Sequence, residues 1–420
     1  MSIKKTYTSV SLFSGCGGMD EGLHLAGFLP LTCCEIDRNA AASLAQWLDQ
    51  KEAICPILPD VIQVDPKKLR QQLKLRKGEL DLLVGGPPCQ SFSLMGKRGS
   101  LTDVRGNLLF EMVRFAREFM PKALLIEQVK GLLSAPDLEE KVGGVFKQLI
   151  EEIEALGYEV NAKVLCAADY GVPQLRHRLF IVALKKQRFE FPAPTHSASP
   201  PQEQQLMIKT LPAYVTVGDA IADLPAPPRK GQPEVFPNHV DVTPARDQER
   251  IADVPMGQSL GKQLHLPESI RRNLSLKDTT KFRRLDWDLP SLTLRCGEVF
   301  YHPVENRYLT PRDYLRLHGY RDDHILHGPI RGRTGTVKEL DQHRLVANSV
   351  PPPLATAIGR AIVEQALDRR SKVHYRRKFT AENSPQKFQF SWDGTRQKNV
   401  RKSVIATKID ASVTRQLLLE

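Results

Sequence analysis

The sequence lacks the patterns of secreted, membrane-spanning and zinc-binding proteins. Its seven cysteines are odd in number and include no Cys-x-x-Cys pair, so neither a disulfide framework nor a metal site is expected. It shows no secretory signal and no apolar run of 18 residues, which predicts a soluble chain. Unpaired thiols fit a reducing, intracellular compartment.

Two common phosphate-binding loops are also missing, namely Gly-x-Gly-x-x-Gly and the P-loop with its Lys-Ser/Thr. A different glycine turn, Ser14-Gly15-Cys16-Gly17-Gly18, follows a predicted strand at residues 8–13 and precedes a helix that ends around Gly27. The next predicted strand, residues 31–35, ends in Glu35, which is placed to accept hydrogen bonds from ribose hydroxyls. The pattern therefore favours a nucleoside ligand over a phosphate ligand.

Positive charge is abundant. The 420 residues carry a formal net charge of +12, which suits a polyanionic partner, although a basic protein that binds no polyanion would have the same composition. A hydrophobic content of 41% allows a large core, and the length allows two or three domains.

The most informative stretch of the sequence is residues 84–93, which read Val-Gly-Gly-Pro-Pro-Cys-Gln-Ser-Phe-Ser. An apolar run at residues 80–84 predicts a buried parallel strand that leads into it. Two glycines allow close approach of a ligand, and two prolines stiffen the backbone before Cys89. Most free cysteines are inert core residues, but an inert cysteine does not need this rigid polar frame. Cys89 is therefore the candidate nucleophile.

Two further polar motifs follow predicted strands. Residues 123–127 form an apolar strand that ends in Glu127. Residues 174–178 read Gln-Leu-Arg-His-Arg, and alternation places Gln174, Arg176 and Arg178 on one face if the backbone is extended. Paired guanidinium groups can bind a phosphate or a carbonyl, whereas an ordinary charged edge strand would look the same.

Together these motifs resemble the cytosine-C5 DNA methyltransferases, in the family's order along residues 8–182 and 285–365. By resemblance, S-adenosylmethionine would be the cofactor. Phe13 would stack on its adenine, the glycine turn would line its methionine, Glu35 would hold the ribose, and Asp65, at the end of a predicted strand over residues 61–65, would contact the adenine amino group. The resemblance places these residues around the cofactor: Phe13, Ser14, Gly15, Cys16, Gly17, Gly18, Glu35, Ile36, Asp65, Pro87, Asn348 and Ser349.

The resemblance also implies the catalytic and DNA-binding residues. Cys89 would attack carbon 6 of a flipped-out cytosine, Glu127 would donate a proton at N3, Arg178 would hold the O2 carbonyl, and Arg176 would hold a phosphate or the loop after Cys89. That loop, residues 94–106, is basic and is expected to close over the DNA; an ordinary solvated loop would have the same composition. The residues expected to contact DNA are Gln90, Ser93, Lys97, Arg98, Arg105 and Gln174.

Three positions depart from the family pattern: Pro66 follows the expected adenine-contacting Asp65, Gln128 replaces an Asn, and Ala347 replaces a Gly. The implied fold is α/β, with a mostly parallel seven-stranded sheet and one antiparallel strand. We expect a catalytic domain at residues 1–188 and 289–368, a smaller target-recognition domain at residues 189–288, and a basic, partly disordered tail at residues 369–420. The helix after Thr310 is expected to carry a capping box with Asp313.

Duplex DNA is the expected partner, and the expected reaction is methylation of cytosine C5 within a short sequence, without a metal. The protein would be a cytoplasmic, nucleoid-associated monomer, and the resemblance allows a cognate restriction endonuclease. Two alternatives remain: a tRNA cytosine methyltransferase on the same scaffold, and an inactive DNA-binding regulator.

Overall fold

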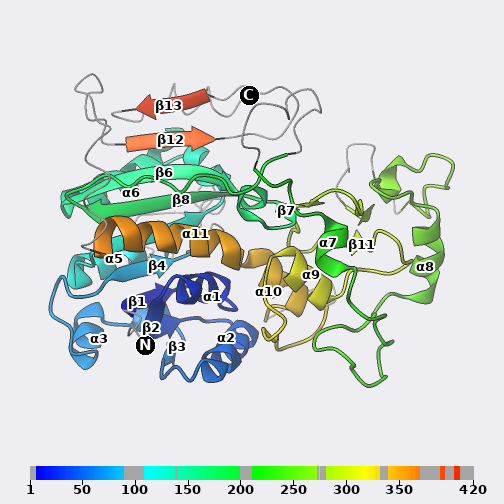
Figure 1. Cartoon of the computed structure of the whole chain (residues 1–420), viewed down its shortest axis with the longest axis horizontal. Helices are drawn as coiled ribbons and strands as arrows, with labels where there is room; N and C mark the ends of the chain where they lie inside the picture. The colour runs from blue at the N-terminus through cyan, green and yellow to red at the C-terminus, as the bar shows by residue number, and fades with distance from the viewer. Residues whose placement is uncertain are drawn as a thin grey trace.

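The computed structural model describes residues 6–88, 108–137, 141–198, 211–271, 274, 281–331 and 339–368, and the backbone of two later strands, 388–392 and 402–406. Its main body is a seven-stranded sheet with the order β3-β2-β1-β4-β5-β8-β6 (Figure 1). The strands are β1 (Tyr7–Leu12), β2 (Phe28–Cys34), β3 (Ile57–Leu58), β4 (Leu82–Gly85), β5 (Ala123–Gln128), β6 (Tyr158–Cys166) and β8 (His177–Lys185). β8 is antiparallel to both of its neighbours, and the other pairs are parallel, which confirms the predicted sheet.

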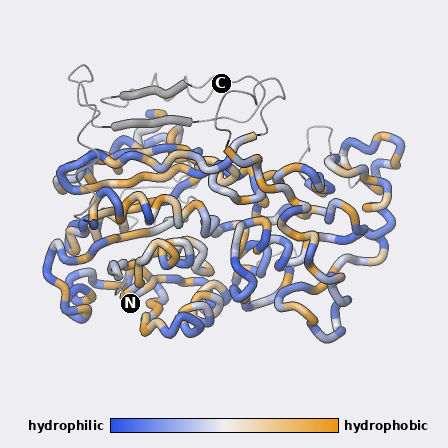
Figure 2. The backbone as a smooth tube through the Cα atoms, in the orientation of Figure 1, coloured by the Kyte–Doolittle hydropathy of each residue, from blue (hydrophilic) through white to orange (hydrophobic). Residues whose placement is uncertain are grey.

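Helices cover both faces of this sheet. One face packs against α3 (Pro66–Gln72), α5 (Leu108–Phe119) and α6 (Gly144–Ala155). The other packs against α1 (Gly18–Leu25), α2 (Arg38–Gln50) and α11 (Pro352–Ile362), which continues as a π-helical turn, Val363–Leu367. Strands buried on both faces explain the apolar runs in the sequence, and Figure 2 shows hydrophobic residues concentrated along them.

The strand register decides where the polar residues meet. Leu12 pairs with both Cys34 and Gly85, and Gly85 pairs with Ile126. The four parallel strands β1, β2, β4 and β5 therefore end at one edge of the sheet. Their next residues meet at this carboxyl edge, where open α/β sheets bind ligands.

Residues 217–326, called the second region below, lie beside the sheet (Figure 1). They contain α7 (Val217–Ile221), α8 (Ala245–Ala252) and α9 (Pro311–Leu317), followed in the chain by α10 (Gln342–Asn348). Their strands are short: β9 (Arg283–Arg284) pairs with β11 (Phe300–Tyr301), and β10 (Ser291–Leu292) pairs with β7 (Gln174–Leu175). The β9–β11 pair crosses the expected boundary at residue 288, whereas the β10–β7 pair joins the residues just after that boundary to the expected catalytic domain.

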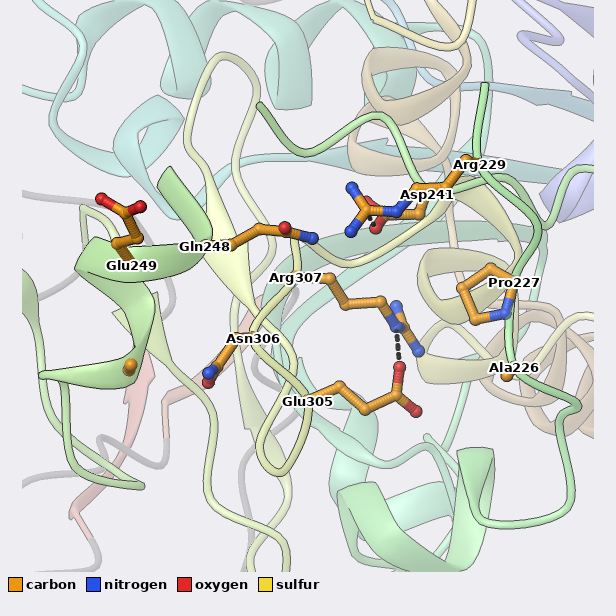
Figure 3. Close-up of a pocket in the computed structure, with 10 residues that line it drawn as sticks. Ala226, Pro227, Arg229, Asp241, Gln248, Glu249, Glu305, Asn306 and Arg307 are labelled. Atoms are coloured by element: carbon orange, nitrogen blue, oxygen red, sulfur yellow. Dashed lines mark hydrogen bonds and ion pairs between the residues drawn. The ribbon is translucent and has the colours of Figure 1, made fainter. Parts of the chain in front are cut away.

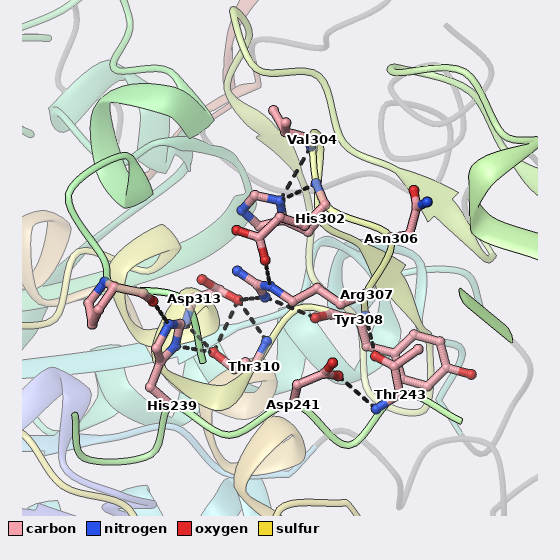
Figure 4. A network of polar contacts seen from close by, with 12 residues as sticks. His239, Asp241, Thr243, His302, Val304, Asn306, Arg307, Tyr308, Thr310 and Asp313 are labelled. Atoms are coloured by element: carbon pink, nitrogen blue, oxygen red, sulfur yellow. Dashed lines mark hydrogen bonds and ion pairs between the residues drawn. The ribbon is translucent and has the colours of Figure 1, made fainter. Parts of the chain in front are cut away.

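A buried polar network joins the parts of the second region (Figure 4). Asp313 accepts from the Arg307 guanidinium at 2.6 Å and from the Thr310 backbone N–H at 2.7 Å. His239 contacts the Thr310 hydroxyl through Nδ1 at 2.8 Å. Thr310 and Asp313 form the capping box of α9 that the sequence predicted. The network thus fixes the 239–243 segment against the 302–313 segment.

The tail contains an antiparallel pair of strands, β12 (Phe388–Trp392) and β13 (Lys402–Ala406). β12 lies beside β6 at the edge of the main sheet (Figure 1). The sequence analysis predicts a partly disordered tail and did not identify these two strands. Among the described residues, no helix has the length and apolar character needed to cross a membrane.

Candidate active site

A cavity of about 590 Å³ opens at the carboxyl edge of the sheet. On one side it is lined by residues that follow β1 and β2, including Phe13, Gly15, Cys16, Glu35 and Ile36. On the other side it is lined by Gly86, Pro87 and Pro88 after β4, and by Glu127 and Arg178 of β5 and β8. The cavity therefore joins the predicted nucleoside site to the predicted catalytic residues.

The nucleoside side is organised by hydrogen bonds around Glu35. Its carboxylate accepts from the Gly15 N–H at 2.7 Å and from the Asp37 N–H at 2.8 Å. Gly15 has a φ of +58°, a conformation that glycine adopts at little cost. Burial raises the pKa of Glu35, and the two N–H bonds oppose this effect. The carboxylate thus fixes the glycine turn and keeps lone pairs for a ligand.

Three residues of the glycine turn that belong to the predicted cofactor set do not line this cavity. Ser14 bonds the Ser11 hydroxyl at 2.9 Å, and Gly17 is the N-cap of α1. Gly18 lies against Tyr320, where an added Cβ would be 2.3 Å from the phenol oxygen. These residues shape the turn from behind, because their small side chains allow close packing.

Asp65 needs a correction. Residues 61–63 form a 3-10 helix instead of the expected strand, and Asp65 caps α3 by accepting from the Lys67 and Lys68 N–H groups. It is not among the residues that line the cavity, whereas Asp60, Val61 and Ile62 are. Asp65-Pro66 is instead a helix start. Asp60, which is followed by the apolar Val61, lines the cavity, and its carboxylate also caps the 3-10 helix by accepting from the Ile62 N–H.

Glu127 and Arg178 form the polar centre of the other side. The Arg178 Nε lies 2.9 Å from Glu127 Oε1, and both side chains are largely buried. Burial raises the pKa of Glu127, although Arg178 lowers it. A carboxyl group with a raised pKa in a dry pocket can act as a proton donor near neutral pH.

Gln128 supports this site in spite of its departure from the family pattern. Its side-chain amide donates to the Pro87 carbonyl at 2.6 Å and is buried. It therefore ties β5 to the rigid Pro87-Pro88 segment, which leads directly to Cys89.

The other two residues of the Gln-x-Arg-x-Arg motif are structural, which contradicts two expectations. Gln174 is fully buried and bonds the Leu317 carbonyl at 3.1 Å and the Leu294 N–H at 3.2 Å, so it is not a DNA contact in this structure. Arg176 is also fully buried and donates to the carbonyls of Ala347 and Ser349 at 2.7 and 2.9 Å. It holds the segment before α11 instead of a phosphate.

That segment places Asn348 and Ser349 on the cavity, and their contact with a cofactor stays a prediction. Asn348 Oδ1 accepts from the thiol of Cys296 at 2.9 Å. Asp37 also lines the cavity and was missed; its carboxylate caps α2 and accepts from the Leu340 N–H at 2.7 Å. An Asp two residues after the strand-ending Glu35 was the available signal.

Several predicted residues lie outside the described part of the chain. They are Cys89, Gln90, Ser93, Lys97, Arg98 and Arg105. Their roles remain predictions.

A separate pocket of about 580 Å³ lies in the second region (Figure 3). Arg229, Asp241, Gln248, Asn306 and Arg307 are among the residues that line it. Two of the lining residues bond each other, since the Nε of Arg307 donates to Oε2 of Glu305 at 2.6 Å. The pocket carries groups of both charges, and none of the predicted site residues lies there.

Comparison with known proteins agrees with this geometry. The family model of the C-5 cytosine-specific DNA methylases matches residues 7–364. The Type II methyltransferase M.Eco47II of Escherichia coli is 33% identical over 384 residues, covering 87% of this chain and 81% of the relative. The Type II methyltransferase M.PspPI of Psychrobacter sp. (strain TA137) is 34% identical, and the match covers 86% of this chain and 79% of the relative.

The fold is also similar to a crystal structure of a DNA modification methyltransferase encoded within an Escherichia coli prophage. The TM-score is 0.60 at 22% identity, and the match covers 86% of this chain and 99% of that one. The matched family model spans both the cavity residues and the second region. The chain therefore belongs to the C-5 cytosine-specific DNA methylase family and is a DNA (cytosine-5-)-methyltransferase.

Proposed function

We propose that this enzyme transfers a methyl group from S-adenosylmethionine to carbon 5 of a flipped-out cytosine in a specific short duplex sequence, with Cys89 as the nucleophile. The observation that carries the proposal is the 590 Å³ cavity, which connects the glycine turn and Glu35 to Glu127 and Arg178. A bound donor and a target base could meet there without crossing the sheet.

The cavity fits a nucleoside cofactor in size and chemistry. Its volume lies within the range of about 300–1,000 Å³ that is typical of small-molecule sites. Phe13 offers an aromatic wall, Glu35 offers acceptors for ribose hydroxyls, and Asp60 replaces Asp65 as the acceptor proposed for the adenine amino group. Asn348 and Ser349 would contact the same ligand. When bound, S-adenosylmethionine supplies an electrophilic methyl group.

The residues of the other side would activate the base. A thiolate at Cys89 adds to carbon 6 of cytosine, and a proton from Glu127 reaches N3, so that the ring becomes an enamine. Arg178 would hold O2 while charge develops on the ring. The nucleophilic carbon 5 could then take the methyl group, and the donor would leave as S-adenosylhomocysteine with the electron pair of the broken S–C bond. Removal of the carbon 5 proton by a base, departure of the Cys89 sulfur as a thiolate and return of the N3 proton to Glu127 would restore the aromatic ring.

The target cytosine must leave the helix to reach this cavity, which costs a few kcal/mol. Residues of the second region would read the surrounding sequence, and the Type II relatives support a short defined site. We also propose that the enzyme is a monomer and that a cognate restriction endonuclease accompanies it. The net charge of +12 supports binding to the phosphate backbone.

Labelled S-adenosylmethionine with plasmid DNA, followed by nucleoside analysis, tests the reaction. We expect label in 5-methylcytosine; label on the exocyclic N4 or on adenine would contradict it. Label in tRNA but not in DNA would favour the tRNA alternative, and DNA binding without transfer would favour an inactive regulator. Methylation mapping in a methylation-free host should give one short motif.

The nucleophile is tested by Cys89→Ser. Turnover should fall by several orders of magnitude, because an alcohol is far less ionised than a thiol. DNA binding should persist. DNA that carries 5-fluorocytosine should trap the wild-type enzyme covalently, since fluorine cannot leave as a proton. Near-normal turnover of the serine variant would show that Cys89 is not the nucleophile.

A further inference from the structure

A buried histidine–carboxyl contact lies behind the glycine turn. Nδ1 of His324 is 2.8 Å from Oε2 of Glu21, and both side chains are almost completely excluded from solvent. Glu21 belongs to the first turns of α1, and its N–H donates to the Gly17 carbonyl at 2.8 Å. The two partners are 303 residues apart in the chain. The pair therefore connects the helix that follows the glycine turn to a segment near the end of the fold.

His324 and Tyr320 together form a base of two rings under the turn. Their centroids are 4.5 Å apart. An added Cβ on Gly17 would be 4.0 Å from the His324 ring. The Tyr320 hydroxyl lies 3.3 Å from the sulfur of Cys16, which lines the cavity. The position of the two rings thus determines how far Cys16 and the glycine turn extend into the cavity.

The segment that carries these rings is anchored on its other side as well. Arg312 donates to the His324 carbonyl at 3.1 Å and to the Pro237 carbonyl at 2.9 Å. Asn238 exchanges two hydrogen bonds with Leu326, each of 2.9 Å. Because these contacts hold the backbone at His324 and two residues after it, its ring is a fixed support.

We propose that His324 is a positioning residue for the methyl donor, which it serves by holding Glu21 and the glycine turn in the shape that binds the cofactor. This proposal rests on the proposed function, since it assigns the cavity to S-adenosylmethionine. The bond between Nδ1 and the Glu21 carboxyl group fixes the orientation of the imidazole ring.

The test replaces both partners. The double variant Glu21→Leu/His324→Phe leaves no unpaired buried charge, and such replacements are often tolerated by the fold. We expect S-adenosylmethionine to bind about tenfold more weakly by titration calorimetry, which corresponds to about 1.4 kcal/mol. KM for the cofactor should rise in parallel, while kcat changes less than about twofold, because the catalytic side of the cavity is untouched.

Two further variants separate positioning from general stability. Glu21→Gln keeps an acceptor oxygen for Nδ1–H and should retain cofactor affinity. His239→Phe removes another fully buried histidine with two hydrogen bonds, away from the cavity, and should lower the melting temperature without weakening cofactor binding.

Normal cofactor affinity in the double variant, with a lowered melting temperature, would overturn the proposal and leave the pair a purely structural role. A loss of kcat at unchanged KM would also overturn it. Absence of S-adenosylmethionine binding in the wild-type enzyme would instead contradict the proposed cofactor, which makes the two failures distinguishable.

Discussion

The sheet region and the second region use buried charge in different ways. In the sheet region, the core is apolar, and the ion pair Glu127–Arg178 lies at the strand ends, where it faces a cavity. In the second region, Arg307 and Asp313 are buried and paired, and they bond backbone groups of their own segment, while Arg307 also lines the second pocket. The first arrangement keeps charged groups available to a substrate. The second uses them where short strands provide few backbone hydrogen bonds.

This difference predicts that charge removal should affect stability in the second region and reaction rate at the cavity. A buried pair that loses one partner leaves an uncompensated charge, which is far more costly than loss of an exposed pair. Removal of a group that acts mainly in the transition state lowers the rate with little effect on folding.

The largest effect on stability is expected for Asp313→Asn. Burial opposes ionisation of Asp313, but Arg307 lowers its pKa, and the charge is needed to balance that guanidinium. The free energy of unfolding should fall by about 3–5 kcal/mol in urea denaturation. Asp219→Asn is the matched control, because Asp219 has the same place in an exposed capping box and should cost about 1 kcal/mol. Equal losses would show that burial of Asp313 in its network does not increase the cost of removing the charge.

The two arginines of one motif give a sharper comparison within the sheet region. Arg176→Met should lower the free energy of unfolding by about 1–3 kcal/mol for each buried carbonyl that it leaves without a partner. Arg178→Met should change stability little, because Glu127 can take up a proton, but should lower the single-turnover methylation rate about 100-fold. Normal stability of Arg176→Met would contradict its structural role, and an unchanged rate of Arg178→Met would contradict its catalytic role.

The smallest effect concerns pH. Burial raises the pKa of Glu127, so its protonated form persists above the ordinary carboxyl range. Since the proposed step needs the protonated form, the single-turnover rate should fall as pH rises through that raised pKa. Glu127→Gln keeps an N–H donor at every pH, so this alkaline decline should disappear in the slower variant. A decline of the same shape in both proteins would assign it to another group.

Some features of the structure could be predicted from the sequence, and others could not. Apolar runs ending at Cys34, Val84 and Glu127 were recognisable because strands buried on both faces need continuous hydrophobic residues. The glycine turn, Glu35 and the Pro-Pro segment were recognisable for similar local reasons. Asp65 was misplaced because a helix cap and a ligand contact use the same residue type in the same kind of loop. Side-chain type alone could not separate them.

By itself, the sequence determined several strands and helices, because these depend on local periodicity. Its short motifs at strand ends indicated the family, and the resemblance to that family implied the seven-stranded sheet. Only the tertiary structure decided which polar residues face the cavity. Gln174 and Arg176 share a motif with Arg178, yet they bond segments more than 100 residues away, while Arg178 meets Glu127. Their partners depend on how distant segments pack, and no local pattern records that packing.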